Sequence, residues 1–95
     1  MAVKIIIDRK VKKGKELEFS EMLKQLRLKA VSSKGYISGE TLRALSDRHN
    51  YIVVGTWQSV DDWKNWEKNL DRKKIQARIE EIMMRPTKTK IYVYA

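Results

Sequence analysis

The chain has 95 residues, contains no cysteine and carries a formal net charge of +9. This length fits a single domain over residues 1–95 with a modest core, and the lack of cysteine excludes disulfides, thiolate metal ligands and a cysteine nucleophile. No apolar run approaches the roughly 20 residues that span a bilayer, and Met1–Lys10 lacks a secretory core. We therefore expect a cytoplasmic protein with no membrane segment.

The N-terminal part of the chain predicts a strand followed by a helix. Apolar residues alternate over Val3–Asp8, which is the period of a strand. Arg9–Lys15 is predicted to be a charged loop. Apolar residues then recur at helical spacing over Glu16–Val31, at Phe19, Leu23, Leu26 and Ala30. Gly35 is expected just beyond the end of this helix, where a left-handed residue is common.

A hairpin follows. Tyr36–Leu45 is predicted as the second strand and Tyr51–Trp57 as the third, because both are rich in β-branched and aromatic residues. The polar segment Ser46–Asn50 between them predicts the turn. His49, the only histidine, falls in this segment and is interpreted as a solvated turn residue. One histidine and no local cluster of ligand residues predict no metal site.

The third strand leads into two helical segments. Ser59 and Asp62 form a short capping box, which predicts a helix over Val60–Asn69. Asp71 is expected to cap a further helix over Arg72–Met84, with Ile75, Ile79 and Ile82 or Met83 on one face. Pro86 disfavours helix at the residue before it. The last strand is predicted over Thr87–Tyr94.

The predicted order β-α-β-β-α-β is that of a ferredoxin-like α+β fold with an antiparallel sheet. Right-handed crossovers place the helices on one face of this sheet, and the other face of such a sheet is usually polar. Here it carries apolar residues, and an exposed apolar patch usually marks an interface. We therefore expect a homodimer with the sheets packed face to face. The residues expected at this interface are Ile6, Ile52, Val54 and Tyr92.

The chain resembles the antibiotic biosynthesis monooxygenase family from Val3 to Tyr94. The matching segments are Lys34–Tyr36, Glu40–Arg43, Tyr51–Ser59, Trp63 and Trp66. The resemblance implies a dimeric α+β barrel. It also implies oxidation of quinols or polycyclic phenols without a cofactor, and no nucleotide-binding motif in the sequence indicates one.

Trp66 is the residue for which the resemblance implies a role at the site. In the haem-degrading branch of the family, a tryptophan at this place lines the pocket together with an asparagine and a haem-binding histidine. The corresponding positions here fall at Ile7 or Asp8 and near Gln76. Because asparagine and histidine are both missing from these positions, and glutamine is not a usual haem ligand, we expect no haem degradation.

Trp63 and Trp66 lie three residues apart, so they share a helix face without pointing in one direction. We expect Trp63 to anchor the helix to the sheet. Trp66 is expected to line a ligand cavity together with Ile7 and Gln76. Arg43 leaves two alternatives open: a partner for a ligand carboxylate, or a surface arginine.

Three functions follow from these features. The first is a cofactor-independent oxygenase acting on a small aromatic molecule, or a ligand-binding relative of one. The second is a nucleic-acid-binding module, because this element order and a basic charge also suit RNA. Tyr51–Trp57 lacks the basic-glycine-aromatic signature of such modules, so we expect the basic residues to be a solvated surface. The third is a dimeric binding protein without catalysis.

Overall fold

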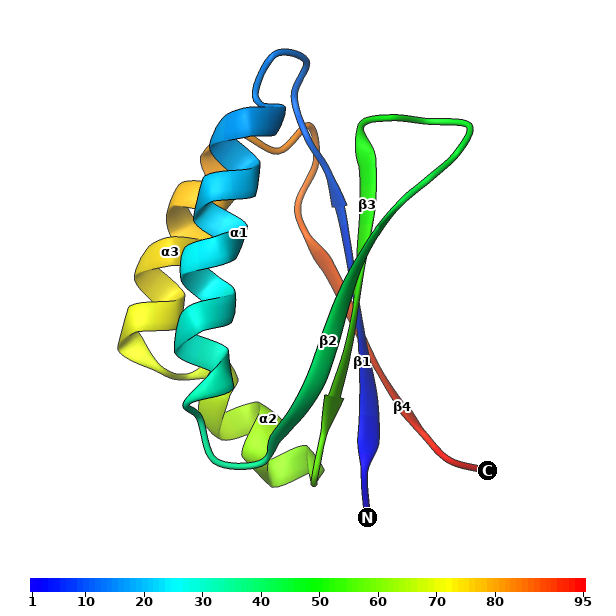
Figure 1. Ribbon diagram of the computed structural model, residues 1–95, viewed down its shortest axis with the longest axis vertical. Coiled ribbons are helices and arrows are strands. Elements are labelled where there is room, and N and C mark those ends of the chain that lie inside the picture. The colour runs from blue at the N-terminus through cyan, green and yellow to red at the C-terminus, as the bar shows by residue number, and fades with distance from the viewer.

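The computed structural model describes residues 1–95 and shows a four-stranded antiparallel sheet with three helices on one face (Figure 1). The strands are β1 (Val3–Lys10), β2 (Tyr36–Arg43), β3 (Asn50–Trp57) and β4 (Lys88–Val93). The helices are α1 (Glu16–Val31), α2 (Val60–Glu67) and α3 (Leu70–Glu81). The strand order is β2-β3-β1-β4. The predicted ferredoxin-like β-α-β-β-α-β order is therefore confirmed.

The end of β1 is one departure from the prediction that bears on the site. The strand continues past Asp8, because Arg9 and Lys10 pair with Tyr51 and Asn50 of β3. The predicted charged loop is therefore shorter by two residues at its start. Arg9 then has the same orientation as Ile5 and Ile7, since alternate residues of a strand share a face.

The caps of the second and third helices decide where they begin. The amide N–H of Asp62 donates to Ser59 Oγ at 3.1 Å, so the predicted serine cap of α2 is confirmed. The prediction of Asp71 as the cap of α3 is wrong. Asn69 caps that helix instead, accepting from the Arg72 amide at 3.1 Å, and α3 begins at Leu70. Asparagine caps as well as aspartate does, so the earlier of two candidate caps starts the helix.

Gly35 takes the left-handed conformation expected of it, with φ of +86°. A side chain here would also collide with Asp62 in the first turn of α2. The Gly35 carbonyl accepts a hydrogen bond from the Gln58 amide at 2.8 Å. This turn therefore fixes the end of α1 against the start of α2, and only glycine fits it.

The hydrophobic core fills the layer between the sheet and the helices. On α1, Phe19, Leu26 and Ala30 are buried as predicted, while Met22 is buried and Leu23 only half-buried. The strands add alternate residues from one face. The most buried apolar residues are Val3, Ile5, Val11, Phe19, Trp57, Trp63 and Ile79.

The outer face of the sheet carries the apolar residues predicted for an interface. Ile6 pairs with Val54, Asp8 with Ile52, and Lys4 with Tyr92, so the four apolar residues share the face away from the helices. Tyr92 is 50% exposed. That shared face is confirmed, while the homodimer itself stays a prediction. None of the helices is long and apolar enough to cross a membrane.

Candidate functional site: an aromatic cavity containing a buried arginine

A cavity of about 60 Å³ lies between the sheet and the helices. Its sheet wall comes from β1, β2 and β3, and its helix wall from α1 and α2. Of the fourteen lining residues, ten are hydrophobic, which makes a largely apolar chamber. The apolar and aromatic lining residues include Ile5, Ile7, Leu23, Leu26, Val53, Trp57, Trp63 and Trp66.

All three tryptophans of the chain line this cavity, and they are arranged around Trp57. Trp66 stacks on Trp57 with ring centroids 6.2 Å apart and planes at 23°. Trp63 meets Trp57 edge-on at 5.9 Å, and Tyr36 does so at 5.4 Å. Stacked and edge-to-face pairs are the favourable arrangements of aromatic rings. The cavity therefore has rigid aromatic walls suited to a flat ligand.

The two helix tryptophans are alike in burial and in their place in the cavity wall, whereas the sequence predicts different roles for them. Trp66 and Ile7 line the cavity as expected, but so does Trp63. Trp63 is 2% exposed and Trp66 is 5% exposed. Trp63 also contacts a residue outside the cavity lining, since the guanidinium of Arg72 lies 5.3 Å from its ring centroid. The expected anchoring by Trp63 thus coexists with a place in the cavity wall.

Sequence reasoning missed Arg9, which also lines the cavity and is only 1% exposed. Its Nη2 donates to Gln76 Oε1 at 2.7 Å, while its Nε and Nη1 have no hydrogen-bond partner. Burial lowers the pKa of Arg9 to about 10, helped by the charge of Arg72 and opposed by that of Glu80. The side chain therefore remains a cation at neutral pH.

The signal for Arg9 is present in the sequence. Residues facing the helices recur every second position from Val3 through Ile5 and Ile7, and the same spacing continues through Arg9 to Val11. An arginine between Ile7 and Val11 in that series is an inward-facing charge. The predicted strand ends at Asp8, so Arg9 falls in the predicted loop and not on the inward face.

Gln76 does not line the cavity but holds the arginine that does. Its Nε2 donates to Glu80 Oε1 at 2.7 Å and to Thr87 Oγ1 at 3.2 Å, which fixes the amide with its oxygen toward Arg9. Glu80 thus balances the charge of Arg9 through an intervening amide and not by direct contact. Gln76 has a positioning role in this arrangement.

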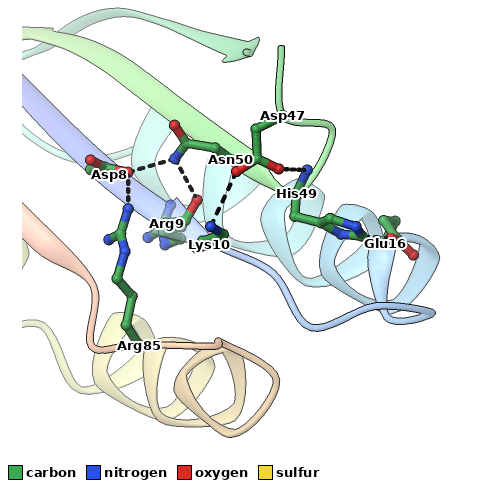
Figure 2. Close-up of polar contacts among 8 residues, drawn as sticks. All are labelled: Asp8, Arg9, Lys10, Glu16, Asp47, His49, Asn50 and Arg85. Carbon is green, nitrogen blue, oxygen red and sulfur yellow. Dashed lines mark hydrogen bonds and ion pairs between the residues drawn. The ribbon is translucent and has the colours of Figure 1, made fainter. Parts of the chain in front are cut away.

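Arg43 lies outside the cavity. It borders a shallow surface hollow near the β2–β3 turn, together with Lys13, Arg48 and His49. The His49 amide donates to Asp47 Oδ1 at 3.0 Å, and its Nδ1 lies 3.2 Å from Glu16 Oε1 (Figure 2). His49 is in the turn, as predicted, but it is not a fully solvated residue, because its Nδ1 is buried beside Glu16 of α1. The structure places neither His49 nor Arg43 where it can reach a ligand in the aromatic cavity.

A second hollow lies beside the cavity. This groove, of about 490 Å³, lies between α1 and the hairpin and is lined by Phe19, Leu23, Arg27, Thr41 and Tyr51 among others. Leu23 and Arg27 border both spaces. Arg27 Nη2 donates to Thr41 Oγ1 at 2.7 Å, which ties α1 to β2 at this point. The cavity and the groove are therefore neighbours that share one leucine and one arginine in their linings.

The chain is similar to one known protein family and to several solved structures. A family model described as antibiotic biosynthesis monooxygenase matches residues 2–78. No protein with a curated description matches the chain by sequence. Similar solved structures include a conserved protein from Methanosarcina mazei Go1, with a TM-score of 0.95 and 19% identity over 100% of this chain and 94% of that one.

Two further similar structures are described as oxygenases. A putative antibiotic biosynthesis monooxygenase from Nitrosomonas europaea has a TM-score of 0.90 and 16% identity over 98% of this chain and 89% of that one. SnoaB, a cofactor-independent oxygenase from Streptomyces nogalater, has a TM-score of 0.89 and 12% identity over 99% and 93%. At these identities the likeness establishes a shared fold.

Proposed function

Because the chain belongs to the antibiotic biosynthesis monooxygenase family, we propose that it is a cofactor-independent monooxygenase acting on a small aromatic, quinol-type substrate. One observation carries the proposal: the aromatic cavity contains a buried cation, Arg9, with unpartnered N–H groups. Oxygenation without a cofactor needs an electron-rich substrate that itself gives an electron to dioxygen. The protein then has to supply a dry chamber and a group that stabilises developing negative charge.

The reaction is balanced without an external reductant. One oxygen atom enters the phenol ring as a quinone carbonyl, at a carbon that lies para to a hydroxyl and carries hydrogen. The other oxygen atom leaves as water with the two hydrogens that the substrate loses. Electrons pass from the ionised phenol to dioxygen, so the phenol is oxidised and dioxygen is reduced.

Arg9 supports this chemistry by favouring the ionised substrate. The cavity lining contains no aspartate, glutamate, histidine or lysine that could serve as a general base. A cation beside the phenol oxygen lowers the pKa of that phenol, as an opposite charge does for any acid. The proton then leaves to water, and no protein base is required in the cavity.

Substrate entry is proposed between α1 and β2. The cavity is smaller than the roughly 300–1,000 Å³ of typical small-molecule sites. The adjoining groove offers further volume, and Leu23 and Arg27, which is bonded to Thr41, line both spaces. A change of the Leu23 rotamer with loss of that bond would join them, and the substrate would then occupy both.

Oxygen uptake with 1,5-naphthalenediol, in which the carbon para to each hydroxyl carries hydrogen, tests the proposal with no added cofactor. We expect a hydroxynaphthoquinone that carries one atom from isotopically labelled dioxygen, formed with one water per dioxygen consumed. Thr41→Val removes the hydrogen bond from Arg27 and keeps the charge of Arg27, so it serves as a variant with a freer entry and should lower KM more than it changes kcat. Uptake no faster than in buffer, for a panel of phenols shown to bind, would contradict an oxygenase and leave a binding protein.

The second part of the proposal is assembly as a homodimer through the outer sheet face. The apolar residues Ile6, Ile52 and Val54 on that face support it, as does the dimeric barrel that family membership implies. Polar pairs are interspersed, including a hydrogen bond of 2.7 Å from Lys4 Nζ to Thr56 Oγ1. An interface of this mixed kind is typical of a wet but specific contact.

A further inference from the structure

We infer that the cavity selects an anion: Arg9 binds a negatively charged oxygen of the ligand while the tryptophans hold its ring. The inference rests on the proposed site and names its substrate class. That class is a flat aromatic molecule with an ionised phenolate or carboxylate oxygen. Neutral aromatic molecules of the same shape are expected to bind less tightly.

The first support is the unfinished hydrogen bonding of Arg9. A guanidinium carries five N–H donors, and only its Nη2 has a partner within the protein. Leaving donors of a charged group buried without acceptors costs free energy, and native proteins do so rarely. Because Arg9 lines the cavity, an acceptor bound there would complete its hydrogen bonds. Charge-assisted bonds to an oxyanion are the strongest that it can make.

The second support is the sign of the charge around the cavity. Two arginines line it, Arg9 deep within it and Arg27 at the boundary with the groove. No carboxylate lines it, and the charge of Arg72 is close enough to act on Arg9. Electrostatic interactions strengthen in a space with little water. The cavity is therefore favourable to an anion and unfavourable to a cation.

The third support is the way Arg9 is held. Glu80 could neutralise Arg9 by direct contact, but Gln76 lies between them and bonds to both. Arg72, which lies outside the cavity, leaves only its Nε buried without a partner, whereas Arg9 leaves both Nε and Nη1 without one. Here one nitrogen is fixed by Gln76 and two are left free. That is the arrangement of a side chain positioned for a further partner.

Para-nitrophenol is the probe for the test, because its ionised form absorbs at a different wavelength from its neutral form. When it is bound, we expect the pKa of its hydroxyl to fall by about one unit or more, as beside any close opposite charge. Para-nitroanisole has nearly the same shape and cannot ionise, and it should bind at least about tenfold more weakly. Quenching of tryptophan fluorescence measures both affinities, since every tryptophan of the chain borders the cavity.

Arg9→Met should abolish both the pKa shift and the preference for the phenolate, and Arg9→Lys should restore part of each. Arg72→Met is the matched control, because it removes a buried arginine that does not line the cavity. We expect it to retain most of the shift. Equal pKa values for the bound phenol in the parent and in Arg9→Met would overturn the inference.

Comparing the two ligands on the parent protein needs no variant, so the test holds even if Arg9→Met does not fold. Equal affinities for the phenolate and the anisole would overturn the inference. A lowered phenol pKa with no oxygen uptake from any bound phenol would support the anion site and overturn the oxygenase. Oxygenation that is unchanged in Arg9→Met would support the oxygenase and overturn the anion site.

Discussion

Gly39 and Gly55 lie opposite each other in the pairing of β2 with β3, and both line the cavity. Two facing residues without side chains leave a hollow in the sheet wall, which Trp57 and Tyr36 border. An added Cβ at Gly55 would meet Trp57 Nε1 at 3.6 Å and Ile5 Cβ at 3.9 Å, which are ordinary contacts. The cavity thus depends on the lack of a side chain at a position where a small one would fit.

Gly55→Ala should therefore block the ligand without unfolding the protein. Alanine fills part of the cavity and restricts the unfolded chain, so the free energy of unfolding should stay level or rise by about 0.5 kcal/mol. Binding of para-nitrophenol, followed by tryptophan fluorescence, should weaken about tenfold or more. Ser38→Ala, on the opposite sheet face, is the control and should leave binding unchanged. Undiminished affinity in Gly55→Ala would show that the ligand binds elsewhere.

The tryptophans of α2 should respond differently to truncation. Trp63→Ala removes a ring packed between Trp57 and Arg72 and should cost about 3–5 kcal/mol of unfolding free energy. Trp66→Phe keeps a ring stacked against Trp57 and should cost much less while weakening ligand binding. Urea unfolding and a ligand titration measure the two effects. A larger loss of stability in Trp66→Phe than in Trp63→Ala would contradict this division.

The fold was predictable because each element carries a strong local signal. The alternation in β1, the helical spacing in α1 and the Ser59 cap are each sufficient without knowledge of the rest of the chain. The errors lie at element ends. Asn69 and Asp71 are both competent caps, and the helix begins after the earlier of the two.

The site was predictable only where it coincides with the core. Trp66 and Ile7 are apolar residues on inward faces, so their place in the cavity follows from spacing. Arg9 and Gln76 meet across 67 positions of sequence, and no local pattern brings them together. The Gly39–Gly55 pairing depends on the hairpin register, in which Arg43 pairs with Tyr51, and β2 ends at Arg43 instead of at the predicted Leu45.

Gln76 and Arg9 should be energetically coupled. Gln76→Met leaves the buried guanidinium without its only acceptor in the protein and should cost about 2 kcal/mol. In the Arg9→Met background the same change should cost clearly less, because no buried charge is left unsatisfied. A double-mutant cycle of urea unfolding gives the coupling energy. Additive costs would show that Gln76 acts through Glu80 and Thr87 alone.

Arg9→Met by itself should leave the unfolding free energy level or raise it. Replacing a poorly paired buried charge with an apolar side chain of similar length is often neutral or stabilising. Combined with loss of the phenolate preference, that result would mark Arg9 as a residue kept for binding at the expense of stability. Thermal unfolding measures the first quantity, and a strong destabilisation would indicate a structural arginine.

Asp8 should contribute to acid sensitivity. Burial alone would raise its pKa, but hydrogen bonds from Asn50 at 2.7 Å and from Arg85 at 3.1 Å, with nearby positive charges, lower it from the ordinary 3.8 (Figure 2). A pKa lower in the folded than in the unfolded state stabilises the fold above the unfolded value. That contribution is lost as the pH falls through the folded value.

Unfolding free energy should therefore fall less steeply in Asp8→Asn than in the parent as the pH drops below about 4. The two proteins should differ most near neutral pH, where the parent has the ionised carboxylate. Equilibrium urea unfolding across this range makes the comparison. Because Asp8 is partly exposed, salt should reduce the difference. Parallel pH profiles would show that its hydrogen bonds do not depend on its charge.

Ile52→Lys should prevent the proposed dimer while leaving the protomer folded. Ile52 lies on the outer sheet face, and its helix-side neighbours Tyr51 and Val53 are untouched by the change. In an isolated protomer the lysine would reach water at little cost. In a face-to-face pair the two-fold axis would place two unpaired charges in the interface, at a cost of several kcal/mol.

Light scattering measures the mass of each protein at micromolar concentration. We expect a dimer for the parent, a monomer for Ile52→Lys, and a dimer for the control Leu28→Lys, which adds the same charge to an exposed position on α1. Circular dichroism should show that all three are folded. A parent that is monomeric at this concentration would contradict the dimer. A dimer that persists in Ile52→Lys would place the interface on another surface, since the two added lysines, unlike Lys4 with its bond to Thr56, would have no partner between the sheets.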